Sequence, residues 1–248
     1  MAENRFVIVI PSYNNKQWCR KNLLSALNQD YPAFRIIYTD DFSPDGTGEE
    51  VEKLVSQYDK AGKVTLIRNQ QRLGAMHNMY DMVHKCEDDE IVAVLDGDDW
   101  LAHSKVLERL SNEYDKGVWI TYGQYRSTPD NRIGCSRQIP QSVIDTNGFR
   151  KFRWCSSHIR TYFAWLFKRI RKEDFMLDGK WLEMTSDLAA MFPMLEMAGP
   201  NQAFISDVLY IYNVLSPIND AKVNLNLQQS IEMKIRAMKS YERVFYDK

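Results

Sequence analysis

Short apolar runs recur at nearly even intervals along the first hundred residues. They span Phe6–Ile10, Phe34–Tyr38, Val64–Ile67 and Ile91–Leu95. Each run is rich in β-branched residues and too short for a typical helix, so each predicts a buried strand. Strands that alternate with helical segments at this spacing predict right-handed βαβ crossovers. The chain is therefore expected to be an α/β protein with a mostly parallel sheet flanked by helices.

Several other segments also show a periodic spacing of apolar residues. Between the second and third runs, one helical face is formed by Val51, Leu54, Val55 and Tyr58, which follow the i, i+3, i+4, i+7 spacing. Ser43-Pro44 predicts the start of that helix, as an N-cap followed by a first helical proline. Val118–Tyr125 alternates apolar and polar residues and predicts a further strand that extends the sheet.

Two helices are predicted in the second half of the chain. Thr185-Ser186-Asp187 precedes an apolar segment that ends at Gly199-Pro200, which is typical of a helix with both end signals. Pro193 inside it predicts a kink or a later start. Leu225–Phe245 predicts a terminal amphipathic helix that either packs on the domain or makes a homodimer contact.

Composition limits the class of protein. A chain of 248 residues with 44% hydrophobic and 26% charged residues is ordinary for one large globular domain. Its net charge of -1 argues against a dedicated nucleic-acid binder. The four cysteines are scattered, which indicates neither a zinc site nor a disulfide framework. The first residues lack a signal-peptide pattern and no apolar run is long enough to cross a bilayer, so we expect a cytoplasmic protein.

Three carboxylates follow the fourth apolar run, at Asp96, Asp98 and Asp99. Clustered like charges repel and raise one another's pKa values, so the cluster favours a bound cation. The carboxyl end of a parallel strand is also where an open α/β sheet binds its ligand. Oxygen ligands suit Mg²⁺ or Mn²⁺. The alternative is a polar turn, since Asp-Gly is an ordinary turn dipeptide.

Loops after the other predicted strands carry further polar residues. The loop that begins at Pro11 can cap the next helix with Asn or Ser. Asp40 and Asp41 follow the second strand, and a carboxylate there can accept the imide hydrogen of a pyrimidine or a ribose hydroxyl. Arg72 and Gly74 precede a helix start, and guanidinium groups and helix N-termini both favour phosphate oxygens.

These motifs together resemble those of family 2 glycosyltransferases of the GT-A fold. They are Ile10–Asn14, Asp40–Thr47, Gly74–Asn78 and Leu95–Asp99, in that order over roughly the first hundred residues. The resemblance implies a nucleotide-sugar donor, usually a UDP-sugar, a divalent metal at the Asp-x-Asp motif and inversion at the anomeric carbon. It also implies an acceptor-side helical region toward the carboxyl terminus.

The resemblance assigns roles by position. Pro11 and Tyr13 would flank the base, Asp41 would hold it, Asp96 would lie near the ribose and Asp98 on the metal. The full donor-binding set is expected to be Pro11, Ser12, Tyr13, Asp40, Asp41, Arg72, Gly74, Asn78, Asp96 and Gly97, and the metal set Asp98 and Asp96, with Mn²⁺ or Mg²⁺ as the ion. The family often has Gly-Ser after its paired aspartates, where this chain has Phe42-Ser43, so the base preference stays open.

Transfer also needs a base for the acceptor hydroxyl. In similar enzymes it lies in an acidic motif at a helix start, which Asp187 matches, with Glu183 as the rival. The alternative is that Asp187 only complements the helix N-terminus. The segment at 207–212 resembles the strand that follows the base helix, and Asn213 or Asp220 is expected near the metal.

The segment 149–172 contains eight Lys or Arg residues and no Asp or Glu, with aromatic residues between them. Such a segment could contact an anionic membrane surface peripherally or a lipid-diphosphate acceptor, or help hold the donor diphosphate. The alternative is an amphipathic helix with its aromatics in the core and its cations in solvent.

The predicted organisation is a nucleotide-sugar-binding half at 1–125, an acceptor-side half of the same domain at 126–220 and a helix at 221–248. The acceptor would be a glycan, lipid-linked or protein hydroxyl, and no nucleic acid is expected. Two other classes remain open. A nucleotidyltransferase usually needs a Gly- and Arg-rich loop, and Pro11–Asn15 has neither residue type. A catalytically silent module that binds the nucleotide-sugar would keep the same fold.

Overall fold

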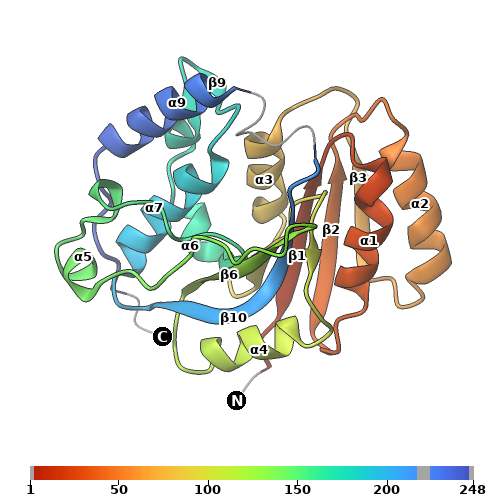
Figure 1. Ribbon diagram of the computed structural model, residues 1–248, viewed down its shortest axis with the longest axis horizontal. Coiled ribbons are helices and arrows are strands. Elements are labelled where there is room, and N and C mark those ends of the chain that lie inside the picture. Colours follow the sequence, from red (N-terminus) through yellow and green to blue (C-terminus); the bar gives the residue numbers. More distant parts are fainter. Residues whose placement is uncertain (1–2, 217–223, 246–248) are drawn as a thin grey trace.

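The computed structural model describes residues 3–216 and 224–245. Its centre is an eight-stranded sheet in the order β3-β2-β1-β4-β7-β6-β10-β5 (Figure 1). The strands of this sheet are β1 Phe6–Ser12, β2 Phe34–Asp40, β3 Val64–Arg68, β4 Ile91–Val94, β5 Trp100–Leu101, β6 Ile120–Thr128, β7 Arg160–Phe163 and β10 Gln202–Asn213. A separate hairpin pairs β8 Met176–Leu177 with β9 Lys180–Trp181.

Most neighbours in the sheet are parallel. Strands β1, β2, β3 and β4 pair in parallel, and so do β6 and β10. Strand β7 is antiparallel to both β4 and β6, and β5 is antiparallel to β10. The predicted mostly parallel α/β sheet is therefore confirmed, with all five strands expected from periodicity present. Strand β6 and its neighbours join residues before and after position 125 in one sheet.

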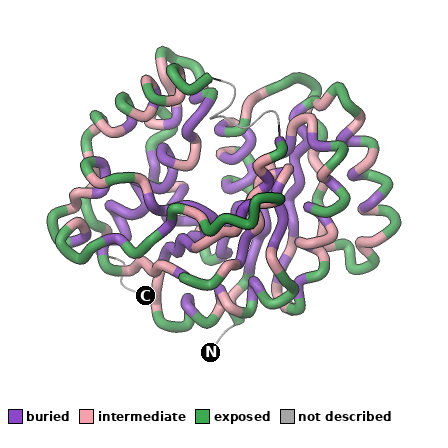
Figure 2. Tube along the Cα trace, viewed as in Figure 1, coloured by how far each residue is buried: buried purple, intermediate pink, exposed green. Residues whose placement is uncertain are grey.

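Helices cover both faces of the sheet. They are α1 Lys16–Leu27, α2 Thr47–Tyr58, α3 Ala75–His84, α4 Val106–Tyr114, α5 Gln141–Asp145, α6 Ala164–Lys168, α7 Ser186–Ala198 and α9 Leu225–Ala237, with short 3₁₀ turns η1 Phe149–Lys151 and η2 Lys172–Phe175. In β1, Ile8 packs with α1, α2 and α4, whereas Val7 and Val9 pack with α3, α6 and α7. Figure 2 shows the resulting buried strands between helices whose outer faces are exposed. Burial on both faces explains the continuous apolar runs.

Helix α2 begins later than the sequence predicted. It starts at Thr47, after Gly46 at φ +85°, so Ser43-Pro44 is not its N-terminus. Asp45 performs the capping, because its Oδ1 accepts hydrogen bonds from the backbone N–H and the hydroxyl of Thr47 at 2.9 and 2.6 Å. Ser43 instead accepts a hydrogen bond from the backbone N–H of Asn14 at 2.9 Å, which ties the first two strand-end loops together.

The basic and aromatic segment 149–172 is not a single amphipathic helix. It contains η1, β7 and α6 and ends at the first residue of η2. Its aromatic residues nevertheless lie in the core, as the alternative interpretation expected, with Phe149, Tyr162 and Phe167 all buried. Strand β7 was not predicted, because a run of four residues is too short to give a periodic signal.

The two helices near the carboxyl terminus differ in how well they were predicted. Helix α7 begins at Ser186 as expected and runs through Pro193, so the later start is wrong. Helix α9 ends at Ala237, eight residues before the predicted end. It packs on the domain through Ile231 and Ile235, both buried; a dimer contact stays a prediction. Within 3–216 and 224–245, no helix has the length and apolarity needed to cross a bilayer.

Candidate active site

A cavity of about 330 Å³ lies at the carboxyl ends of β1, β2 and β4. It is lined by most residues that the sequence singled out: Pro11, Ser12, Tyr13, Asp41, Arg72, Gly74, Asn78, Asp96, Gly97, Asp98 and Asp187. Asp40 and Glu183 do not line it. The parallel strands explain this convergence, since their carboxyl ends share one edge of the sheet.

Asp41 organises one end of the cavity. Its Oδ1 accepts hydrogen bonds from the Asn69 side chain and the backbone N–H of Leu73, and its Oδ2 accepts one from the backbone N–H of Gly74, each at 2.8 Å. Burial would raise the pKa of Asp41, but these hydrogen bonds outweigh it and lower the pKa below its ordinary value. An ionised carboxylate therefore fixes the loop that carries Arg72.

The same end presents an aromatic and cationic pair. The guanidinium carbon of Arg72 lies 4.0 Å from the ring centroid of Tyr13, in a cation–π contact. The cation–π contact holds a positive charge and a flat ring together at the mouth of the cavity. Such a pair suits the stacking of a planar base and the binding of an anionic group.

Asp40 is directed away from this cavity. It is buried beside Gly48, where an added Cβ would lie 2.7 Å from the Asp40 Oδ2. Burial raises the pKa of Asp40, with opposing contributions from Ser43 and Arg68. Consecutive side chains of a strand point to opposite faces, so only one of the paired aspartates reaches the site. The expectation that Asp40 contributes to donor binding therefore has no support in this geometry.

The acidic turn after β4 rests directly on the end of β1. A Cβ at Gly97 would lie 2.6 Å from both the Ser12 hydroxyl and the Asn15 amide nitrogen, so only glycine allows this approach. Ser12 is in turn held by the Tyr38 hydroxyl at 2.9 Å. The roles of Ser12 and Gly97 are thus partly to shape the floor of the cavity.

Asp99, which belongs to the predicted acidic cluster but was not assigned as a metal ligand, is the most buried of the three carboxylates. Its Oδ2 accepts a hydrogen bond from the Tyr210 hydroxyl at 2.6 Å, and its Oδ1 accepts one from the Asn213 backbone N–H at 2.7 Å. Burial and the neighbouring charges of Asp98 and Asp96 raise its pKa. The pKa of Asp98 is also raised, by burial and by Asp96. A bound cation would therefore stabilise the ionised form of these carboxylates.

His158 completes a set of potential metal ligands. One ligand atom from each of Asp96, Asp99 and His158 lies within 4.8 Å of the others. His158 Nδ1 is buried, has no hydrogen-bond partner among the described residues and lies 3.7 Å from Asp96 Oδ2. Burial and Arg160 lower the pKa of His158 to about 3, so its imidazole is neutral and able to ligate. Two carboxylates and an imidazole suit a divalent ion such as Mn²⁺.

Arg160 on β7 joins the acidic turn to α7. Its Nη2 lies 3.2 Å from Asp96 Oδ2 and its Nη1 lies 3.5 Å from Asp187 Oδ2. The guanidinium is buried, so these two carboxylates balance most of its charge. Sequence reasoning missed both His158 and Arg160 because it missed β7.

Asp187 lies in the first turn of α7, as predicted. Its Oδ1 accepts a hydrogen bond from the Leu188 backbone N–H at 2.9 Å. Burial raises the pKa of Asp187, while Arg160 opposes that rise. A carboxylate with a raised pKa is suited to accept a proton at neutral pH. Glu183 is exposed and lies outside the cavity, so the geometry favours Asp187 over its rival.

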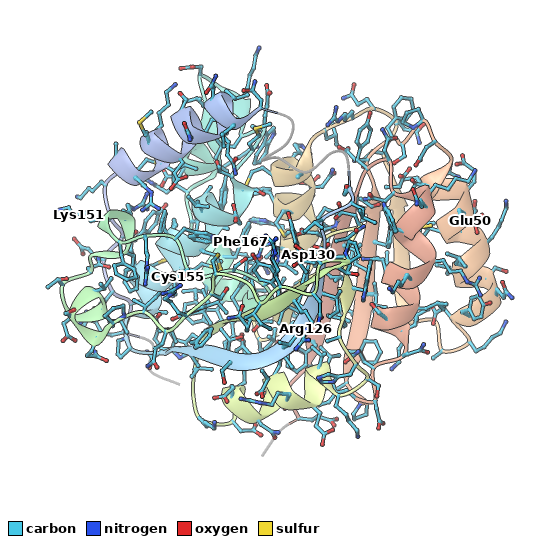
Figure 3. The ribbon with its side chains drawn as sticks, viewed as in Figure 1. Glu50, Arg126, Asp130, Lys151, Cys155 and Phe167 are labelled. Atoms are coloured by element: carbon cyan, nitrogen blue, oxygen red, sulfur yellow. The ribbon has the colours of Figure 1, made fainter. Side chains whose placement is uncertain are left out.

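The cations of segment 149–172 have several different surroundings. Arg150 is buried against Glu196 at 2.6 Å, Lys168 pairs with Asp88 and Arg171 pairs with Asp174. The exposed remainder comprises Lys151, Arg153, Arg169 and Lys172. Figure 3 shows Lys151 at the periphery and Phe167 in the interior. Membrane contact through this segment stays a prediction. Fewer positive charges are exposed for such a contact than the sequence suggested.

Two further expectations concerned residues near the metal. The backbone of Asn213 contacts Asp99 directly, which places it beside the candidate ligands. Asp220 lies outside the described residues.

Comparisons with known proteins agree on one family. Residues 7–175 match the family model described as glycosyl transferase family 2. The chain is 30% identical to an uncharacterized glycosyltransferase of Haemophilus influenzae, over 48% of this chain and 46% of that protein. It is 25% identical to the Escherichia coli UDP-Glc:alpha-D-GlcNAc-diphosphoundecaprenol beta-1,3-glucosyltransferase WfaP, over 72% of this chain and 69% of that protein.

Solved structures show the same fold. A crystal structure of Staphylococcus aureus TarS in complex with UDP-GlcNAc has a TM-score of 0.61 at 18% identity, covering 84% of this chain and 58% of that one. The mannosyltransferase PcManGT from Pyrobaculum calidifontis, in complex with GDP-Man and Mn²⁺, has a TM-score of 0.60 at 17% identity, covering 97% and 68%. The GT-A prediction is thereby confirmed.

The chain spans about half the length of the Haemophilus influenzae relative. The family model, however, matches well over half of this chain and includes the cavity-lining residues that follow β1, β2, β3 and β4. On that match, the chain belongs to glycosyl transferase family 2.

Proposed function

We propose that the protein is an inverting glycosyltransferase that moves a sugar from a UDP-sugar to a hydroxyl acceptor. One observation carries the proposal: a single cavity joins the Asp41 and Tyr13 end, the acidic turn at Asp96–Asp99 and the carboxylate of Asp187. A nucleotide, a diphosphate and a reacting sugar carbon would occupy these three regions in that order. The relatives support the donor class, since WfaP is named for UDP-Glc and TarS was crystallised with UDP-GlcNAc.

The donor would be held along the cavity. Tyr13 and Pro11 would flank the base, Asp41 would accept a hydrogen bond from it, and Arg72 would neutralise a phosphate oxygen. Asp96 would accept from a ribose hydroxyl as well as facing the metal. These assignments keep the roles that the sequence resemblance implied, apart from Asp40.

The metal would be held by the acidic turn. Asp98 and Asp96 remain the expected ligands, and the geometry adds Asp99 and His158 as candidates. When bound, Mn²⁺ or Mg²⁺ would neutralise the charge that develops on the leaving diphosphate. PcManGT, which was solved with Mn²⁺, supports an ion of this type.

Asp187 would act as the general base. It would accept the proton of the acceptor hydroxyl as that oxygen bonds to the anomeric carbon, while the bond from this carbon to the diphosphate oxygen breaks. Attack opposite the leaving group inverts the configuration in one displacement. Arg160, which contacts both Asp187 and Asp96, would hold the base carboxylate in place between acceptor and donor.

The acceptor would be a hydroxyl of a lipid-linked glycan. WfaP and a second Escherichia coli relative, WfgD at 24% identity, are both named for a diphosphoundecaprenol-linked substrate. The exposed cations of segment 149–172 would then approach the diphosphate or the membrane surface that carries it.

Incubation with a panel of UDP-sugars and Mn²⁺, read by product mass, tests this function. The expected result is release of UDP and free sugar from at least one donor, and transfer when a lipid-linked acceptor is added. UDP binding without turnover of any donor would indicate a silent binding module. Release of pyrophosphate from a nucleoside triphosphate would indicate a nucleotidyltransferase.

A further inference from the structure

A second, smaller cavity of about 40 Å³ opens beside the proposed base. It lies among α3, β4, β7 and α7. It shares six lining residues with the main cavity: Pro11, Ala75, Asp96, Arg160, Ser186 and Asp187. A group attached to a sugar in the main cavity would therefore reach it directly.

The residues that line only the smaller cavity are almost wholly apolar. They are Met79, Val94, Tyr162, Ala190 and Met191, all of which are buried. The hydroxyl of Tyr162 is directed to the Met79 sulfur at 3.7 Å, so it offers the cavity little polarity. Walls of this kind favour an apolar group over a hydroxyl, which would lose its hydrogen bonds to water.

One polar group at the entrance has an unused hydrogen. Arg160 lines both cavities, and its Nε–H is buried without a hydrogen-bond acceptor among the described residues. Its other nitrogens face Asp96 and Asp187. A buried donor without an acceptor is costly, so a ligand oxygen at this point would be favoured.

We propose that the smaller cavity receives the 2-acetamido group of the donor sugar, which makes the protein selective for UDP-N-acetylhexosamines. The methyl group would pack against Met79, Ala190 and Met191, and the carbonyl oxygen would accept the Arg160 Nε–H. A water molecule needs about 10–15 Å³ of such space, so 40 Å³ holds about three heavy atoms, the number in an acetyl group. This inference rests on the proposed function, because it needs a UDP-sugar in the main cavity.

Calorimetric titration of the full chain with Mn²⁺ tests the preference without any acceptor. The probes are UDP, UDP-GlcNAc, UDP-GalNAc, UDP-Glc and UDP-Gal. An apolar pocket discriminates about 10- to 200-fold for each buried methyl or methylene group. We therefore expect the N-acetyl donors to bind at least tenfold more tightly than the corresponding hexose donors.

Two filling variants locate the effect. Ala190→Leu adds three carbons to the apolar wall, and Ala190→Val adds two at the same position, which lines the smaller cavity but not the main one. Each should lower affinity for UDP-GlcNAc at least tenfold, which cancels the expected preference over UDP-Glc. UDP alone should still bind within about twofold of the parent. Ala61→Val, exposed and outside both cavities, is the matched control and should change neither affinity.

The possible outcomes distinguish the acetamido subsite from the proposed glycosyltransferase function on which it rests. Equal affinities for UDP-GlcNAc and UDP-Glc in the parent, or an unchanged preference in both filling variants, would overturn the acetamido subsite while leaving a UDP-sugar enzyme intact. Failure of the parent to bind UDP at all would overturn the proposed function and the subsite together. If Ala190→Leu does not fold, the smaller change Ala190→Val alone decides.

Discussion

Replacing Asp41 by Asn tests whether this carboxylate organises the nucleotide end of the cavity. The substitution keeps the shape but turns one hydrogen-bond acceptor into a donor. Asp41 accepts three hydrogen bonds, all at 2.8 Å, from Asn69, Leu73 and Gly74. With the remaining oxygen in the Oδ1 position, the new amide would face the Gly74 N–H, and that N–H would lose its acceptor.

The expected loss of stability follows from these contacts. The orphaned Gly74 N–H should cost about 1–3 kcal/mol, and each of the two remaining hydrogen bonds should weaken by about 1 kcal/mol when the charge is lost. The free energy of unfolding should therefore fall by about 3–5 kcal/mol, as measured by urea denaturation. UDP affinity should fall about tenfold or more, because one charged hydrogen bond to the base is lost with the loop geometry.

Asp40→Asn is the matched control. Asp40 accepts a long 3.4 Å hydrogen bond from the Ser43 backbone N–H, and burial raises its pKa, so loss of its charge should cost little stability. We expect a change below about 1 kcal/mol and unchanged UDP affinity. Equal destabilisation by the two substitutions would refute the assignment of Asp41 as the organising residue.

The pH dependence should distinguish the two carboxylates as well. The folded pKa of Asp41 is lowered, so its contribution to stability is present above the unfolded pKa and is lost as pH falls through the folded value. The folded pKa of Asp40 is raised, so the folded state gains stability relative to neutral pH as Asp40 becomes protonated. The acid loss of stability, below about pH 4, should therefore be smaller in Asp41→Asn than in the parent or in Asp40→Asn. Asp45, Glu90 and Glu113, whose pKa values are also lowered, keep the remaining loss in all three proteins.

Three further experiments test other parts of the structure. Asp98→Asn should abolish the rise in melting temperature that Mn²⁺ gives the parent. Without metal it should raise stability, because the charge it removes is partly buried and lies beside Asp96. An equal Mn²⁺ shift in both proteins would exclude Asp98 as a ligand. Arg150→Met should cost about 3–5 kcal/mol by leaving Glu196 buried and unpaired, and adding Glu196→Leu should recover most of it in urea denaturation. Gln at Lys151, Arg153, Arg169 and Lys172 should weaken low-salt sedimentation with phosphatidylserine vesicles, whereas no parental binding would exclude membrane contact there.

The strand-end loops were predictable from sequence because parallel strands bring their carboxyl ends together. Apolar runs located β1, β2, β3 and β4, and their following loops supplied Tyr13, Asp41, Arg72 and Asp98. Alternation along a strand could also have shown that Asp40 and Asp41 cannot face the same side.

The residues that sequence reasoning missed depend on long-range pairing. Strand β7 has four residues and is antiparallel to both of its neighbours, which are distant in sequence. Its position between β4 and β6 brings His158 and Arg160 to the acidic turn. The local pattern of apolar and polar residues does not reveal that position. Asp99 was placed in the acidic cluster but not assigned as a ligand for a related reason, since its partners Tyr210 and Asn213 come from β10.

The most direct test of the central claim is the turnover of Asp187→Asn measured beside its UDP affinity. Asn keeps the size of the side chain and much of its compatibility with a helix start, so the fold should survive. Loss of a general base should lower turnover by a factor on the order of 10² to 10⁴ while UDP affinity stays nearly unchanged. Glu183→Gln, at an exposed position outside the cavity, should keep parental turnover. Near-parental turnover in Asp187→Asn, above all with loss of activity in Glu183→Gln, would contradict the account.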